Sequence, residues 1–174
     1  MLCAIARLPE EARIRLRAVQ AAAGRLGYAP PPLYGHITLA VCDRGDEAAF
    51  AKGCRELLTG FGVIDVEYEK VEILTQTAII VATPSKSGGL LSAHDVLAER
   101  FGDSLDAWTR DALWRPHTTL FHHPTAPLES VCRAMAARFV PFQTRVARVE
   151  LSKVTARGYR IVGAIDLRRD HNSA

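Results

Sequence analysis

The sequence predicts a mixed α+β fold built from two lobes related by a pseudo-two-fold axis. Two antiparallel-rich sheets are expected to face a central cleft, with helices on the outside. Three observations support this. Helix-like and strand-like segments mix along the whole chain. Two four-residue motifs, which we call the histidine words, begin 81 positions apart: His-Ile-Thr-Leu at 36–39 and His-Thr-Thr-Leu at 117–120. Phe61 and Phe142, which precede the strands that follow each word, are also 81 apart, and this preserved spacing indicates an internal duplication.

The first quarter of the chain has clear boundaries. The apolar run at 2–7 predicts a strand, and Pro9 suits the start of a helix, where its missing N–H costs nothing. Helix-forming residues with apolar positions at helical spacing predict a helix over 10–26. Three prolines make 28–33 a loop. The β-branched and apolar residues at 36–42 then predict a strand.

The next elements complete the first half. Asp46 is the expected N-cap of a helix that runs to about Thr59. The sequences at 63–74 and 77–83 read as two strands joined by a tight turn at 75–76.

The second half repeats this order. A polar, glycine-containing turn at 84–89 leads to a helix over 90–101, and a polar loop follows at 102–115. The second histidine word opens a strand at 117–122. A helix is then expected over 125–138.

Two long strands are predicted at the end of the chain, over 142–154 and 159–167, with a turn at Arg157 and Gly158. No linker or low-complexity segment interrupts the sequence. We therefore expect residues 1–174 to form a single bilobal domain.

The two histidine words place chemistry on predicted strands. Side chains alternate along a strand, so His36 and Thr38 share one face, and His117, Thr119 and Phe121 share another. If the duplication sets the strands side by side, two imidazoles and two hydroxyls converge on one cleft. The sequence therefore predicts that His36, Thr38, His117 and Thr119 are catalytic.

Imidazole titrates near neutral pH, so one histidine can be neutral while the other is protonated. The neutral ring can take a proton from an attacking hydroxyl or water, and the protonated ring can give one to the departing oxygen. The threonine hydroxyls can bind the non-bridging oxygens of a phosphate. This arrangement requires neither a metal nor a nucleotide energy source, so we expect no cofactor and no metal site.

These words resemble the defining motifs of the two-histidine (2H) phosphoesterase superfamily, which includes LigT-like 2′-5′ RNA ligases and cyclic nucleotide phosphodiesterases. The opening Ala4-Ile5-Ala6-Arg7-Leu8-Pro9 is also similar to the first strand of that family and its helix-starting proline. The resemblance implies metal-independent phosphodiesterase or reversible ligase chemistry on 2′,3′-cyclic phosphates or 2′-5′-linked nucleotides. The implied partners are nucleotides or RNA ends with those linkages.

Residues that flank the motifs are candidates for substrate binding. Aromatic rings there could stack on a base, and an arginine could bind phosphate. Packing at strand ends, or exposure on a turn, explains the same residues equally well or better. The candidates are Tyr34, Trp114, Arg115, Phe121, Arg157 and Tyr159.

Three alternatives remain open at this stage. The same cleft could serve a non-catalytic nucleotide- or RNA-binding protein. His122 and His123 could join the motif histidines in a metal-dependent hydrolase, although His122 points away from His117 by strand alternation. A purely structural or protein-interaction role for a decayed member is the third alternative, and two intact motifs argue against it.

Composition fits an ordinary soluble globular protein, with 48% apolar and 24% charged residues. The net charge of +3 does not by itself predict nucleic-acid binding. No apolar run reaches the length of a membrane span, and no secretory signal is visible. Four scattered cysteines form no zinc-binding pattern. We expect a cytoplasmic monomer that does not contact membranes.

Overall fold

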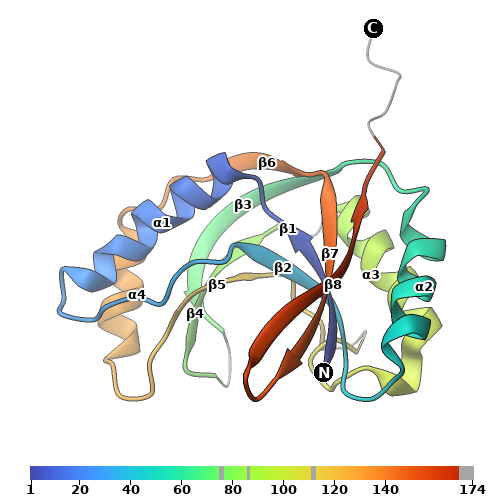
Figure 1. Ribbon diagram of the computed structural model, residues 1–174. Coiled ribbons are helices and arrows are strands. Elements are labelled where there is room, and N and C mark those ends of the chain that lie inside the picture. Colours follow the sequence, from blue (N-terminus) through green and yellow to red (C-terminus); the bar gives the residue numbers. More distant parts are fainter. Residues whose placement is uncertain (75–76, 86, 111–112, 169–174) are drawn as a thin grey trace, which may run out of the picture.

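The computed structural model describes residues 1–74, 77–85, 87–110 and 113–168 (Figure 1). The predicted turn at 75–76 lies outside the described residues. Within them, the elements in chain order are β1 (Leu2–Arg7), α1 (Glu10–Gly24), β2 (His36–Cys42), α2 (Glu47–Leu58), β3 (Ile64–Ile73), β4 (Ile79–Pro84), α3 (Gly88–Phe101), a 3-10 turn (Gly102–Ser104), β5 (Thr118–His122), α4 (Leu128–Ala136), β6 (Phe142–Val146), β7 (Arg148–Thr155) and β8 (Gly158–Asp166).

The strands form two four-stranded sheets, as the α+β expectation requires. One sheet has the order β2-β1-β7-β8 and the other β5-β4-β3-β6, with antiparallel pairing throughout. Helices α2 and α3 pack against the first sheet, while α1 and α4 pack against the second. The two helix pairs therefore lie at opposite ends of the molecule, with both sheets between them (Figure 1).

The two halves of the chain exchange strands. Strand β3 follows β2 and α2 in sequence, yet it lies in the sheet that contains β5. Strand β7 comes from the second half and lies beside β1 in the sheet that contains β2. Strands β4 and β8 follow them into the same sheets, so each sheet contains two strands from the other half of the chain.

The predicted strand over 142–154 is wrong as a single element, because it divides into β6 and β7 in different sheets. Burial alternates through Phe142, Thr144 and Val146, and then two exposed residues, Ala147 and Arg148, come in succession. One continuous strand cannot keep its apolar face inward across such a shift. The chain uses the shift to cross from one sheet to the other.

Local boundaries follow the expected chemistry elsewhere. The Asp46 carboxylate accepts a hydrogen bond of 2.8 Å from the Ala49 amide, which confirms it as the N-cap of α2. Helix α1 ends at Gly24, two residues earlier than predicted.

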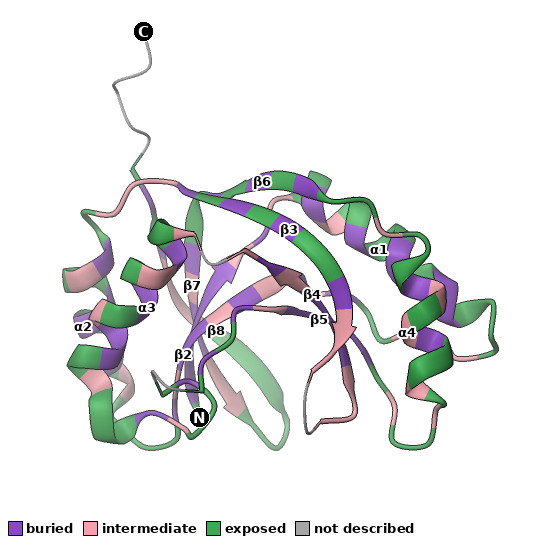
Figure 2. Cartoon of the chain, turned by 180° about the vertical axis from the view of Figure 1, so that it is seen from behind, coloured by how far each residue is buried: buried purple, intermediate pink, exposed green. Residues whose placement is uncertain are grey.

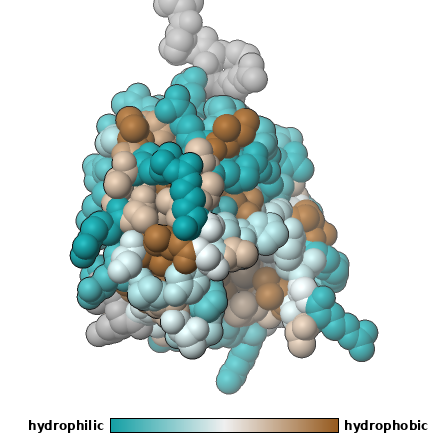
Figure 3. Space-filling model, turned by 90° about the vertical axis from the view of Figure 1, so that its left-hand side faces the viewer, coloured by the Kyte–Doolittle hydropathy of each residue, from teal (hydrophilic) through white to brown (hydrophobic). Residues whose placement is uncertain are grey.

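One hydrophobic core runs through both sheets and under all four described helices, and Figure 2 shows its buried residues on the inner faces of the elements. The outer surface at the α1–α4 end is mainly hydrophilic, with apolar residues in separate small patches (Figure 3). Within the described ranges, none of the helices combines the length and the apolar character needed to cross a bilayer.

Candidate functional site

The two motif strands meet edge to edge at the centre of the molecule. Both β2 and β5 are edge strands of their sheets. The Thr118 hydroxyl donates a hydrogen bond of 2.9 Å to the His36 carbonyl, and the Trp114 indole N–H donates one of 2.9 Å to the Thr38 carbonyl. These bonds bring the sequence-predicted motifs into one region of the fold.

His36 is the first residue of β2 and is partly buried. Burial, which is the largest cause, and the charges of His117 and Arg7 together lower the pKa of its imidazole to about 4, although Glu150 acts in the opposite direction. The ring is therefore neutral at pH 7 and able to accept a proton. The influence of His117 on this pKa also shows that the two imidazoles are electrostatic neighbours.

His117 lies just before β5, with its ring partly exposed. Its Nδ1 is 2.8 Å from the Arg115 carbonyl oxygen. A carbonyl can only accept, so Nδ1 carries the hydrogen in this bond, and Nε2 is left as the atom that can gain or lose a proton.

The two motif threonines occupy equivalent positions in their sheets. Thr38 pairs with Ile5 on β1, and Thr119 pairs with Val81 on β4. Thr119 is exposed, whereas Thr118 beside it is buried, which agrees with the alternation expected from the sequence. The hydroxyl of Thr119 is thus free of the internal bonds that Thr118 makes.

A cavity of about 520 Å³ with a predominantly apolar lining borders Thr38 of the first motif and His117 of the second, whereas His36 and Thr119 are not among the residues that line it. Its described walls come from β2, the β3–β4 hairpin and the loop before β5. They are formed by Thr38, Val41, Leu74, Thr77, Ile79, Asp106, Trp108, Thr109, Leu113, Trp114, Arg115 and His117.

The loop that carries Asp106, Trp108 and Thr109 is docked onto the free edge of β2. The Asp106 amide donates a hydrogen bond of 2.8 Å to the Val41 carbonyl, and the Val41 amide donates one of 3.1 Å to the Thr109 hydroxyl. Trp108 remains 57% exposed beside the cavity. A fixed loop thus holds an open aromatic face next to the motif residues.

The substrate-binding candidates occupy different environments. Arg115 is exposed and lines the cavity. Trp114 also lines it, but its ring is buried and stacks on His94 with centroids 3.9 Å apart. Arg157 and Tyr159 lie on the exposed β7–β8 hairpin, outside the cavity walls.

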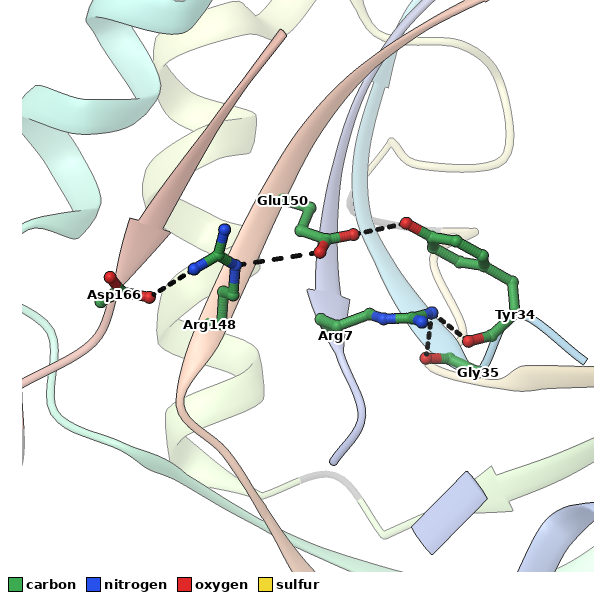
Figure 4. Close-up of polar contacts among 6 residues, drawn as sticks. All are labelled: Arg7, Tyr34, Gly35, Arg148, Glu150 and Asp166. Carbon is green, nitrogen blue, oxygen red and sulfur yellow. Dashed lines mark hydrogen bonds and ion pairs between the residues drawn. The ribbon is translucent and has the colours of Figure 1, made fainter. Parts of the chain in front are cut away.

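Tyr34 is held by other side chains (Figure 4). Its hydroxyl donates a hydrogen bond of 2.6 Å to Glu150, and the Arg7 guanidinium carbon lies 3.7 Å from its ring centroid. Its ring edge also contacts Tyr159, with centroids 5.2 Å apart. One face of the ring is therefore already covered by a cation.

The expectation that Phe121 shares a face with His117 and Thr119 is wrong. Phe121 is fully buried and packs edge-on against Tyr28. The register between β4 and β5 is irregular here: Ile80 pairs with Phe121, and the next residue, Val81, pairs with Thr119. This bulge breaks the alternation and sends Phe121 into the core.

The neighbouring histidines are placed apart from the motif pair. His122 is exposed at the end of β5, and the His123 ring contacts Tyr28 and Phe121. Among the described residues, no group of three or more His, Cys, Asp or Glu side chains is placed to hold a metal ion.

The structure adds charged residues that the sequence reading missed. Arg7 and Glu150 lie beside His36, and Glu72 lies near Arg115. A second repeated word could have identified the carboxylates, because Lys-Val-Glu-Ile at 70–73 matches Arg-Val-Glu-Leu at 148–151 with a spacing of 78.

The register gives these carboxylates equivalent positions. Thr38 and Glu150 both pair with Ile5 on β1. Thr119 and Glu72 both pair with Val81 on β4. The exchange of β3 and β7 therefore supplies each motif strand with one glutamate, two strands away.

A comparison with family models identifies one family. Residues 8–157 match the family model described as the 2′-5′ RNA ligase superfamily. In fold, the chain is similar to TT0787 of Thermus thermophilus, with 22% identity, a TM-score of 0.70, and 98% of this chain and 99% of that one covered. It is also similar to E. coli LigT complexed with 3′-AMP, with 18% identity, a TM-score of 0.65, and 97% of each chain covered.

A more distant likeness is to Usb1 of Kluyveromyces marxianus, with 12% identity, a TM-score of 0.58, and 95% of this chain and 97% of that one covered. The comparison with curated proteins finds no match. The structural likenesses share the architecture of two antiparallel sheets with outer helices.

Proposed function

Because this chain belongs to the 2′-5′ RNA ligase superfamily of two-histidine phosphoesterases, we propose that it is a metal-independent phosphodiesterase. Its substrates are nucleotides or RNA ends that carry a 2′,3′-cyclic phosphate or a 2′-5′ linkage, and the reaction can also run as 2′-5′ ligation. His36 and His117 act as general acid and base, and Thr38 and Thr119 bind the phosphate.

A single observation carries this proposal. The His117 imidazole lies close enough to His36 to lower the pKa of that ring, and Thr38 and His117 line one cavity. Paired histidines with hydroxyl groups can move protons and bind a phosphate without a further reagent.

Hydrolysis of a 2′,3′-cyclic phosphate illustrates the chemistry. One neutral imidazole takes a proton from water as the water oxygen bonds to phosphorus. The bond from phosphorus to the 3′ oxygen breaks, and the other, protonated imidazole gives its proton to that oxygen, so that a 2′-phosphate is formed. The roles exchange in the reverse direction, because each ring ends the step in the state from which the other began.

The cavity supplies a site for the nucleoside. Its apolar walls suit a base, and Trp108 offers an exposed ring for stacking. Arg115 is exposed in the same wall and can pair with a phosphate oxygen. Arg157 and Tyr159, on the β7–β8 hairpin, can contact a longer RNA end from outside the cavity.

The solved structures support a nucleotide ligand by analogy. E. coli LigT has been crystallised with 3′-AMP and with ATP. The present chain shares the fold of that protein at 18% and 19% identity in the two complexes.

The proposal is tested with a panel of 2′,3′-cyclic nucleotides, 2′-5′ dinucleotides and RNA with a cyclic-phosphate end, each assayed in excess EDTA. We expect turnover of at least one class, and loss of turnover in His36→Ala. Binding that survives in His36→Ala, with no turnover by the unsubstituted protein, would instead identify a nucleotide-binding protein. Activity abolished by EDTA and restored by a metal would contradict the metal-independent mechanism.

A further inference from the structure

We propose that Arg7, Tyr34 and Glu150 form a brace that positions the His36 ring for proton transfer. All three are positioning residues in the sense that they act through His36. This inference rests on the proposed function for its kinetic consequences, whereas the brace itself is defined by contacts within the protein.

Tyr34 is the centre of the brace (Figure 4). Its hydroxyl donates a hydrogen bond of 2.6 Å to Glu150 Oε2 on β7. Its ring meets the His36 ring edge to face, with centroids 5.7 Å apart and an interplanar angle of 67°. The tyrosine therefore connects a carboxylate at one end to the histidine ring at the other.

Arg7 fixes the backbone of the same segment. Its guanidinium donates hydrogen bonds to the carbonyl oxygens of Tyr34 and Gly35, and its central carbon lies 3.7 Å from the Tyr34 ring centroid. The two residues that precede His36 are thus held in two ways, by hydrogen bonds to their main-chain carbonyls and by a cation–π contact with the Tyr34 ring.

The brace rests on three paired strands. Arg7 on β1 pairs directly with His36 on β2, and Glu150 on β7 pairs with Ile5 on β1. Groups attached to such a ladder keep their relative positions. The brace therefore limits the orientations that the His36 ring can adopt.

Burying the Glu150 carboxylate is unfavourable unless other groups interact with it. Its side chain is only 14% exposed, and burial of a charge is unfavourable without compensation. Arg148 lies 3.8 Å from it and bonds in turn to Asp166 at 3.1 Å, so the carboxylate belongs to a chain of opposite charges (Figure 4). The same carboxylate thus contacts a cation through one oxygen and accepts the tyrosine hydrogen bond through the other.

Among the residues that the structure describes, the second motif has the same framework but a different set of contacts around it. Arg115 stands two residues before His117, as Tyr34 stands two before His36. Glu72, the equivalent of Glu150, has a pKa below its usual range: burial acts against this shift, and Lys70, Thr83 and then Arg115 produce it.

Arg115 is exposed and lines the cavity, whereas Tyr34 is half-buried and held by Glu150 and Arg7. The framework is therefore used in two ways. One motif carries a ring held by neighbouring side chains, and the other carries a cation on the cavity wall.

The brace also surrounds His36 with opposing charges. Arg7 on β1 and His117 before β5 favour the neutral imidazole, while Glu150 on β7 favours the protonated one. Removing Glu150 or Arg7 should therefore move the pKa of His36 in opposite directions. A merely structural role would not produce opposite shifts.

The first test is kinetic and uses Tyr34→Phe, Glu150→Gln and Arg7→Gln, with Arg7→Lys as a milder variant. Tyr28→Phe and Glu129→Gln are matched controls, because the partly buried Tyr28 packs against Phe121 and Glu129 is exposed on α4. We expect kcat to fall by about tenfold in the brace variants, with KM little changed, since misorientation of a proton-transfer group costs rate. Unchanged kcat, or a change in KM alone, would overturn the proposal.

The second test does not need turnover. The imidazole of His36 is titrated by NMR in each variant, with His36→Asn used to assign its signals. We expect its pKa to fall in Glu150→Gln and to rise in Arg7→Gln, with no change in the controls. Shifts of equal sign, or none, in folded variants would overturn the brace. Opposite shifts in a protein that turns over no cyclic or 2′-5′ substrate would uphold the brace and refute the proposed function.

Discussion

The hydroxyl of Thr118 donates a hydrogen bond of 2.9 Å to the main-chain carbonyl of His36. The residue next to one motif histidine therefore fixes the strand that carries the other. The same hydroxyl lies 2.5 Å from the buried Tyr68 hydroxyl. Thr118 is 1% exposed, while its neighbour Thr119 is exposed and makes none of these contacts. Adjacent threonines in one motif thus have separate roles.

This division predicts opposite outcomes for two conservative substitutions. Thr118→Val should lower the free energy of unfolding by about 1–3 kcal/mol, because it removes the partner of the His36 carbonyl and the Tyr68 hydroxyl in a buried place. Thr119→Val should leave stability nearly unchanged and lower kcat/KM by about tenfold, because it removes a donor to the phosphate. Denaturant unfolding and steady-state kinetics measure the two quantities. A Thr119→Val variant that is fully active would remove this hydroxyl from the mechanism.

The motif histidines should act as a unit. His36→Ala and His117→Ala should each lower turnover by roughly 100-fold or more, the scale for loss of a general acid or base. The double variant should lose much less than the product of the two single losses, because both groups serve one proton-transfer sequence. Rates are measured under single-turnover conditions with folding checked by circular dichroism. Multiplicative losses would show that the two rings act in separate steps.

The sequence was sufficient for the motif strands and for most of the other elements, though not for the division of 142–154 into β6 and β7, because the evidence for a helix or strand is local. Alternation defined β2, the capping residue Asp46 began α2, and the repeated histidine words marked two strands that do meet. Which lobe each strand joins could not be predicted in this way. The exchange of β3 and β7 depends on pairing across the whole chain, and the spacing between repeats does not predict which strands pair.

The position of Phe121 and the role of Glu150 could not be predicted from a single motif. Phe121 enters the core because of a bulge opposite Ile80 and Val81, and strand alternation assumes that no bulge occurs. Glu150 reaches Tyr34 from a distant strand, so its role follows only from the fold. The repeated words at 70–73 and 148–151 did mark both glutamates, although their 78-residue spacing differs from the 81 of the histidine words.

The low pKa of His36 should appear in stability as well as in rate. Its imidazole has a pKa of about 4 in the folded protein, against an ordinary value of 6.5 when unfolded. The unfolded chain therefore binds the proton first, and stability present above pH 6.5 is lost as pH falls toward 4. Between pH 7.5 and 4.5, His36→Asn should lose less stability than the unsubstituted protein, by on the order of 2 kcal/mol. Denaturant unfolding at the two pH values measures this difference. Equal losses in both proteins would contradict the buried, neutral state of the ring.

The cavity makes a prediction about the base. Trp108 is 57% exposed at its wall, and stacking on an aromatic ring contributes about 1–3 kcal/mol per base. Trp108→Ala should therefore raise KM for a 2′,3′-cyclic nucleotide by on the order of tenfold and leave kcat nearly unchanged. Val140→Ala is the matched control, because Val140 is 70% exposed and is not among the residues that line the cavity.

Ribose 2′,3′-cyclic phosphate, which carries no base, separates stacking from a general disturbance of the site. If Trp108 contacts the base, Trp108→Ala should not change KM for ribose 2′,3′-cyclic phosphate, because a substrate without a base makes no stacking contact with Trp108. An equal rise in KM for both substrates would show that Trp108 shapes the site near the phosphate. The base contact would then remain to be located, and the exposed β7–β8 hairpin with Arg157 and Tyr159 would be the next surface to test.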